Sequence, residues 1–151
     1  MGLDASFELG FYPKKHDYVC HVTQLYILQI LRQNGWEFGT SGVKAFLPIN
    51  DNGMFDWQYE KITDDELFGI FKIQSDLKEH IGADITWDNG KFRTLLGLSP
   101  DLSLYFIIER GDRPINAYGV TDFDWFLNKI IPVFKNNEYI GIEYIQFMEH
   151  V

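Results

Sequence analysis

The chain has 151 residues, and because domains usually hold about 100–200 residues, we expect residues 1–151 to form a single globular domain. Hydrophobic residues make up 46% and charged residues 23%, values that exclude extensive disorder as well as collagen-like and coiled-coil architectures. Acidic residues outnumber basic ones by 22 to 13, and the formal charge of −9 argues against direct nucleic-acid binding, because contacts to phosphates need clustered lysine and arginine.

The cellular compartment is predicted from the cysteine content and from the pattern of apolar residues. Cys20 is the single cysteine, so no disulfide can form within the chain. Residues 1–15 lack the basic stretch and the following apolar run of a secretory signal, and no run approaches the roughly 18 apolar residues of a transmembrane helix. We therefore expect a cytoplasmic protein that does not engage a membrane, with its oligomeric state left open.

A strand and a long helix are predicted at the start of the chain. Residues 6–12 (SFELGFY) favour a strand, and Pro13 ends it because proline lacks the backbone N–H of a strand ladder. Residues 17–34 carry apolar side chains three or four positions apart and therefore predict a helix. Asp17 is its expected N-cap, and Gly35 follows its last turn.

A hairpin is predicted from residues 43–49 and 54–59, because residues 50–53 (NDNG) suit a turn with positive φ. Apolar and polar side chains alternate in the second strand, which places three aromatic residues on one face and favours packing of that face against the core. The other interpretation, exposed anchors for a partner, stays open. The three aromatic residues are Phe55, Trp57 and Tyr59.

The next helix has a clear start signal. Thr63 and Glu66 match a capping box, in which the threonine hydroxyl and the glutamate carboxylate each bond a free backbone N–H group. The apolar stripe of this helix continues to Ile81, and Gly82 follows it as a stop. We therefore expect a helix over residues 63–81.

The second half of the chain predicts mostly strands. Residues 103–109 and 139–147 are apolar on both faces, which is typical of strands in the centre of a sheet that is covered on both sides. We expect the last of these in particular to be central. The other predicted elements are a hairpin of residues 85–87 and 92–96, a short strand over 115–118, and a helix over 122–134 that is capped by Thr121 and interrupted by Pro132.

This order of elements predicts the fold class α+β. Hairpins join most neighbouring strands, so we expect a mainly antiparallel sheet of about 6–8 strands with about three helices packed on it. No linker, repeat or low-complexity segment divides the chain.

The sequence contains no motif that assigns an enzymatic reaction. The phosphate-binding GxxxxGK[ST], dinucleotide-binding GxGxxG and nucleophile-elbow GxSxG patterns are absent. His16 and Cys20 could occupy two corners of a metal site, but further ligands at a matching spacing are missing, so we expect a buried Cys20 and a surface His16. Acidic runs at 64–66 and 122–124 fall at predicted helix N-termini, where the helix dipole explains them. We therefore predict no catalytic residue, no metal and no cofactor.

Negative charge is concentrated between residues 50 and 66. Six acidic residues oppose only Lys61 there, so this segment carries −5 of the formal charge of −9. Carboxylates interleaved with large aromatic side chains are typical of a face that binds a basic protein, because the aromatics anchor the partner and the charges steer the encounter. The candidate partner-binding residues are Asp51, Asp56, Trp57, Glu60, Asp64, Asp65 and Glu66.

Size, charge and the missing catalytic motif favour an interaction protein. In length and acidity the chain resembles the small acidic immunity proteins that bacteria pair with toxins, which implies a stoichiometric inhibitor that masks a basic partner such as a toxin. Two alternatives stay open: an accessory protein of a phage or other mobile element, and a small-molecule-binding domain or enzyme with an aromatic-lined pocket. The residues available to line such a pocket are Trp36, Trp57, Trp87 and Trp125.

Overall fold

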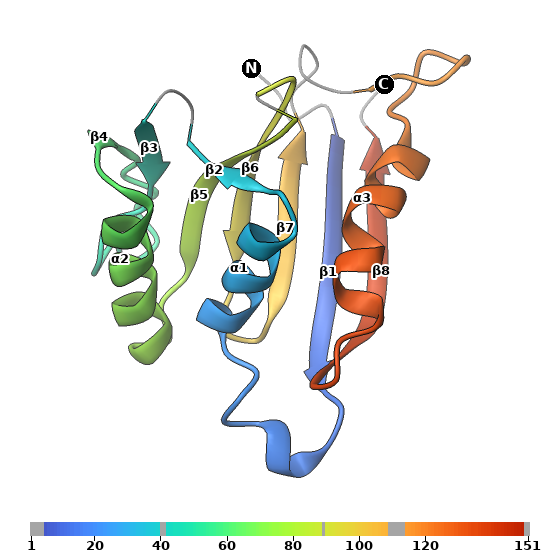
Figure 1. Cartoon of the computed structure of the whole chain (residues 1–151). Coiled ribbons are helices and arrows are strands. Elements are labelled where there is room, and N and C mark those ends of the chain that lie inside the picture. Colours follow the sequence, from blue (N-terminus) through green and yellow to red (C-terminus); the bar gives the residue numbers. More distant parts are fainter. Residues whose placement is uncertain (1–4, 40–41, 89, 109–113, 150–151) are drawn as a thin grey trace.

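The computed structural model describes residues 5–39, 42–88, 90–108 and 114–149. Over these residues, eight strands form one antiparallel sheet in the order β4-β3-β5-β6-β7-β1-β8, with the short β2 paired to β5 (Figure 1). The strands are β1 (Ala5–Pro13), β2 (Glu37–Phe38), β3 (Val43–Phe46), β4 (Gln58–Lys61), β5 (Ile81–Trp87), β6 (Phe92–Leu98), β7 (Ser103–Ile108) and β8 (Ile140–Glu149). The helices are the 3-10 helix η1 (His16–Tyr18), α1 (Gln24–Gln33), α2 (Asp64–Asp76) and α3 (Phe123–Lys135).

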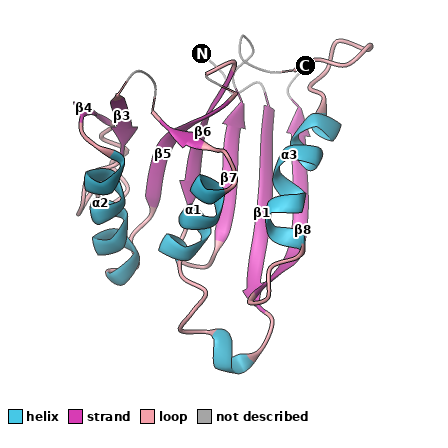
Figure 2. Ribbon diagram, viewed as in Figure 1, coloured by secondary structure: helices cyan, strands magenta, loops and turns pink. Residues whose placement is uncertain are grey.

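Helices α1, α2 and α3 all lie on the same face of the sheet (Figure 1 and Figure 2). β1 shows the consequence, because successive side chains of a strand point to opposite faces. Phe7 and Leu9 are fully buried beneath the helices, whereas Ser6 and Glu8 are half-buried on the other face. Phe7 packs against Phe126 of α3 with ring centroids 6.1 Å apart. The face without helices is called the open face below.

The predicted fold class, α+β, is confirmed. In the described part of the chain, eight antiparallel strands form one sheet, and three α-helices cover one side of it. A cluster of buried apolar side chains from the sheet and from all of these helices forms the core. None of the helices in this part is long and apolar enough to cross a membrane.

The first helix is shorter than predicted. α1 begins directly after Thr23 and not at Asp17, and the Thr23 hydroxyl caps it by accepting a hydrogen bond from the backbone N–H of Tyr26 at 3.1 Å. In the segment before it, His21 stacks on Tyr139, with ring centroids 3.9 Å apart. Packing against the connection between α3 and β8 therefore replaces the expected first turns of the helix.

The predicted hairpin after α1 has shorter strands, and residues 47–57 between β3 and β4 form a loop. The Asp51 carboxylate organises this loop by accepting hydrogen bonds from the backbone N–H groups of Phe55 and Asp56 at 2.8 and 2.9 Å. Phe55 has a positive φ of 53°, which ends the strand alternation. Phe55 and Tyr59 are 53% and 69% exposed, so the expectation that they pack in the core is wrong.

Both hydrogen bonds of the predicted capping box at the start of α2 are present. The helix ends at Asp76, however, and does not continue to Ile81, which is the first residue of β5. Lys78 adopts a left-handed φ of 55°, and the backbone N–H of Glu79 bonds the carbonyl of Gln74 at 2.9 Å. The end of the helix was missed because its left-handed position carries a lysine and not a glycine.

The expectation that the last strand is central is wrong. β8 is an edge strand. It is apolar on both faces because Phe147 packs on Phe123 of α3, with ring centroids 4.6 Å apart, while Met148 lies on the open face. β7 does lie inside the sheet, but helices cover it on one side only. Glu109, the last residue predicted for that strand, lies outside the described residues.

Two smaller predictions near α3 are also wrong. Residues 115–118 form no strand, and an isolated bridge joins Ile115 to Thr121. Asp122, not Thr121, caps α3, with its carboxylate accepting a hydrogen bond from the backbone N–H of Trp125. Pro132 does not end α3, because the helix continues beyond it to Lys135.

Candidate functional site

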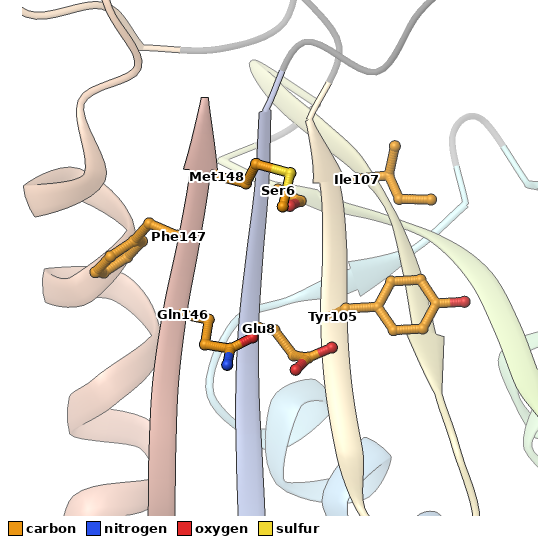
Figure 3. A pocket seen from close by; sticks show the side chains of 7 residues that line it. All are labelled: Ser6, Glu8, Tyr105, Ile107, Gln146, Phe147 and Met148. Carbon is orange, nitrogen blue, oxygen red and sulfur yellow. The ribbon is translucent and has the colours of Figure 1, made fainter. Parts of the chain in front are cut away.

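A hollow of about 660 Å³ lies on the open face, over β7, β1 and β8 (Figure 3). β1 lies between the other two strands, and its open face carries the small residues Ser6 and Gly10 on either side of Glu8. Longer side chains of β7 and β8 rise beside this low floor, so differences in side-chain size hollow the surface. The β1 hollow, as we call it, is lined by Ser6, Glu8, Tyr105, Ile107, Gln146, Phe147 and Met148, although the Phe147 ring itself packs on the helix side.

Strand register places Glu8 in the middle strand of the hollow. Glu8 is paired with Tyr105 of β7 on one side and with Gln146 of β8 on the other. In backbone register, Glu8 therefore lies between a tyrosine and a glutamine. The adjacent row on this face consists of Ile107, Ser6 and Met148.

Tyr144 of β8 closes one end of the row of small residues on β1. Its ring lies against Gly10, where any Cβ would overlap it, and its hydroxyl lies 2.8 Å from the Ser103 hydroxyl of β7. Glycine inside a strand is unfavourable for strand stability, but it allows this close approach. Tyr144 therefore crosses β1 and links the two strands on either side of it.

Tyr105 of β7 leans in the other direction. Its ring lies against Gly97 of β6, where a Cβ would again overlap it, and its hydroxyl lies 2.7 Å from Nε2 of His80. The His80 ring meets the ring of Phe55, with centroids 5.9 Å apart. These contacts connect the β1 hollow with the loop of residues 47–57 across the open face.

The pKa values of the Tyr105 and Tyr144 hydroxyls are both raised. Burial raises the pKa of Tyr105, and the Glu8 charge raises it further. A hydrogen bond with Ser103 lowers the pKa of Tyr144, but burial, a hydrogen bond to Glu8 and the charges of Glu8 and Asp101 outweigh it and raise that pKa overall. Both phenols are therefore protonated at neutral pH and act as hydrogen-bond donors.

His80 is neutral at neutral pH. Burial lowers the pKa of its imidazole below the usual 6.5, against the opposing effect of the Asp51 charge. A neutral imidazole can share the hydrogen bond with the Tyr105 hydroxyl without bringing a positive charge to the open face.

The described part of the chain supplies no basic partner for the Glu8 carboxylate. Among the described residues, no lysine or arginine forms an ion pair with Glu8. Asp84, which also lies on the open face, differs in this respect because Arg93 contacts its carboxylate at 3.0 Å. Glu8 therefore places a negative charge that no basic side chain of the described residues pairs with in a partly desolvated hollow.

Three of the predicted partner-binding residues belong to the loop that covers one end of the open face. Trp57 packs over Gly82 of β5, where a Cβ would lie 3.0 Å from Cη2 of the indole. The Asp51 carboxylate is engaged by backbone N–H groups of its own loop, whereas Asp56 is exposed. A second hollow of about 480 Å³ on this loop is lined by Pro48, Asn50, Asp51, Met54, Phe55 and Asp56.

Three others lie at the start of α2, on the opposite side of the sheet. Asp64 forms an ion pair with the buried Lys44 at 2.6 Å and lies 3.6 Å from Arg32. Arg32 also lies 3.7 Å from Asp65, whose side chain is 94% exposed. The Glu66 carboxylate belongs to the capping box. Two of these three acids therefore stabilise the fold directly.

The structure does not gather the predicted residues on one surface. Glu60 lies on the edge strand β4, directly opposite Lys44 of β3. The loop over the open face carries Asp51, Asp56 and Trp57, whereas the sheet edge and α2 carry Glu60, Asp64, Asp65 and Glu66.

Comparison with protein-family models, curated proteins and solved structures gives no match to this chain. The evidence for the candidate site therefore comes from the structure alone.

Within the residues that the structure describes, no group of three or more His, Cys, Asp and Glu side chains is arranged to hold a metal ion. His16 and Cys20 are both exposed, so the expectation of a surface histidine is confirmed and that of a buried cysteine is wrong. Cys20 lies on the surface because the helix starts after it.

The four tryptophans do not line one pocket. Trp36 is buried and packs against Trp87, with ring centroids 5.4 Å apart. Trp125 packs against Phe92 at 4.7 Å. These three belong to the core under the helices, whereas Trp57 lies on the open face.

The β1 hollow was missed at the level of sequence, although one signal for it exists. Residues 6–12 alternate between large apolar side chains and the smaller or polar Ser6, Glu8 and Gly10, a pattern of strands with one face uncovered. Apolar residues on both faces at 103–109 suggested instead that the sheet is covered on both sides. The close contacts of tyrosine rings with glycines depend on strand register, which the sequence alone leaves open.

Proposed function

We propose that this chain is a non-enzymatic, stoichiometric protein-binding domain that masks a basic partner against its open face. One observation carries the proposal: Glu8 stands without a basic neighbour among the described residues, in a hollow of aromatic and apolar side chains on a sheet face that no helix covers. Desolvated apolar anchors beside a charge of one sign are what a complementary protein surface uses for binding.

Exposed apolar side chains on the open face support a protein partner. Tyr12, Phe55 and Met148 are 44%, 53% and 54% exposed. Contacts through His80 and Tyr105 join the loop that carries Phe55 to the β1 hollow. Large exposed apolar side chains on one face are typical of interaction surfaces in soluble proteins.

The overall charge supports a basic partner. A formal charge of −9 accelerates encounter with a positively charged surface and disfavours acidic competitors. The finer form of the proposal is that the partner is a toxin and that this chain is its immunity protein. Its small size and its broad uncovered face support that form, because such a face can cover the working surface of a second protein.

Partner capture with matched surface variants tests the proposal. The tagged chain is used as bait in a lysate of its native host, and bound proteins are eluted by raising the salt concentration. We expect a basic protein in equimolar amount, lost with Ile107→Arg in the β1 hollow and retained with Ile73→Arg on α2. Ile73 is 46% exposed on the helix side, so it is a control of similar character. Recovery of no protein, or equal capture by both variants, contradicts the proposal.

The volume of the β1 hollow favours a second candidate, the binding of a small molecule. Its 660 Å³ lies within the range of about 300–1,000 Å³ that is usual for ligand pockets, and it holds a carboxylate, an amide and hydroxyl groups. Native mass spectrometry of the chain purified from its host tests this candidate. A copurifying compound that is lost in Ile107→Arg supports it, whereas a spectrum of the bare chain argues for the protein partner.

A further inference from the structure

We propose that the β1 hollow receives an arginine side chain of the partner protein, with the guanidinium against the Glu8 carboxylate and the aliphatic stem between Ile107 and Met148. This inference rests on the proposed function and names the group that the open face recognises.

The shape of the hollow suits a long, slender side chain. Ser6 lies between Ile107 and Met148 in register, and Glu8 follows two residues later on the same strand face. A side chain entering along β1 therefore meets apolar walls first and a carboxylate beyond them. An arginine has this order of groups, three methylenes followed by a cationic head.

The charge in the hollow suits a cation. Glu8 is half-buried, and no lysine or arginine of the described residues pairs with it. Attraction between opposite charges strengthens where protein displaces water, so a bound partner would increase the contribution of this carboxylate.

The polar groups around Glu8 favour arginine over lysine. The Gln146 amide lies beside Glu8 in register, and the Ser6 hydroxyl lies on the same strand face. A planar guanidinium has five N–H donors, so it can bond a carboxylate with two of them and still reach neighbouring acceptors. An ammonium has three donors on one atom and cannot spread them over the same row.

The other acidic residues do not offer the same setting. Asp64 is paired with Lys44, and the Asp51 carboxylate is engaged by its own loop. Asp65 on α2 is 94% exposed and lies outside the hollow. Asp65 is therefore a suitable control, because Asp65→Asn removes the same charge from the opposite side of the sheet.

Titration of the isotope-labelled chain with acetyl-arginine-amide, followed by NMR, tests the inference. We expect the largest shifts at Ser6, Glu8, Gln146 and Met148, and affinity reduced about tenfold or more in Glu8→Gln but unchanged in Asp65→Asn. Acetyl-citrulline-amide, which has the same shape without the charge, should bind at least about tenfold more weakly. A urea midpoint equal to wild type confirms that Glu8→Gln is folded.

Two outcomes overturn the inference: no shifts in the hollow with the arginine probe, or equal binding of the arginine and citrulline probes. If partner capture is still lost with Ile107→Arg, the protein-binding function stands and only its arginine assignment falls. If the arginine probe binds through Glu8 while no partner is captured, the chemistry of the hollow is supported and the proposed function is the part that fails.

Discussion

The two faces of the sheet differ in construction although the same strands build both. On the helix side of β1, Phe7 and Leu9 are fully buried. On the open side of the same strand, Ser6 and Glu8 line a hollow, and Gly10 lies under the Tyr144 ring. The helix-covered face is therefore built like an ordinary protein core, in which large apolar side chains fill the space between the sheet and the helices.

The open face is built differently, because glycines there allow tyrosine rings to lie close to the backbone. Tyr144 covers Gly10 and Tyr105 covers Gly97, and each hydroxyl reaches a polar group on a neighbouring strand or loop. The rings shield the backbone without building a second layer. Residues that fill the core therefore alternate along the same strands with residues of the proposed binding face, so substitutions should separate effects on stability from effects on binding.

The largest difference in unfolding free energy is expected between substitutions at two neighbouring residues of β7. Phe106 is fully buried under the helices, and Phe106→Ala should lower the free energy of unfolding by about 3–5 kcal/mol through loss of contacts and a cavity. Ile107 is half-exposed on the open face, and Ile107→Ala should cost about 1 kcal/mol or less. Urea unfolding measures both, and losses of equal size would contradict the contrast between the faces.

The contacts between tyrosine rings and glycines predict the next effect. In Gly97→Ala the new methyl group meets the Tyr105 ring, so we expect a loss of about 1–3 kcal/mol. Removing the ring as well, in Gly97→Ala with Tyr105→Ser, should make the alanine less harmful than it is alone. A double-mutant cycle on unfolding free energies tests this, and additive effects would show that the ring does not depend on Gly97.

A smaller effect is expected from acidic residues on the two faces. Asp64→Asn removes the partner of the buried Lys44 and should cost about 1–2 kcal/mol while leaving capture of the partner intact. Glu8→Gln should change stability by about 0.5 kcal/mol or less and should weaken capture. Unfolding and capture measured on the same two variants check this, and the reverse pattern would assign binding to α2.

The smallest effect concerns pH. Because burial places the pKa of His80 below 6.5, the unfolded chain binds more protons than the folded chain between the folded pKa and 6.5. The contribution of neutral His80 is complete above that window and is lost as the pH falls through it. Wild type should therefore lose more stability on acidification than His80→Gln, in which this group does not titrate. Parallel slopes in thermal unfolding from about pH 7 to 5 would contradict this account.

The sequence predicted features whose cause is local. The capping box of α2 needs only Thr63 and Glu66, and β1 forms over the residues 6–12 that favour a strand. The fold class follows from the order of hairpins and helices. These features depend on neighbours in the sequence, so composition and spacing are sufficient to find them.

Features that have no local signal in the sequence were not predicted. The left-handed Lys78 that ends α2 has no glycine to mark it. β8 is an edge strand although it is apolar on both faces, because its order in the sheet is a matter of topology. The β1 hollow needs the register of three strands, and register brings Tyr105 and Gln146 beside Glu8.

Site-specific photo-crosslinking is the most direct test of the central claim that the open face binds the partner. A crosslinking amino acid is placed at Met148, which is 54% exposed on the open face, or at Ile73, which is 46% exposed on α2. The account predicts that Met148 crosslinks to a basic protein and that Ile73 does not. Crosslinking from Ile73 alone would place the binding surface on the helices and contradict the account.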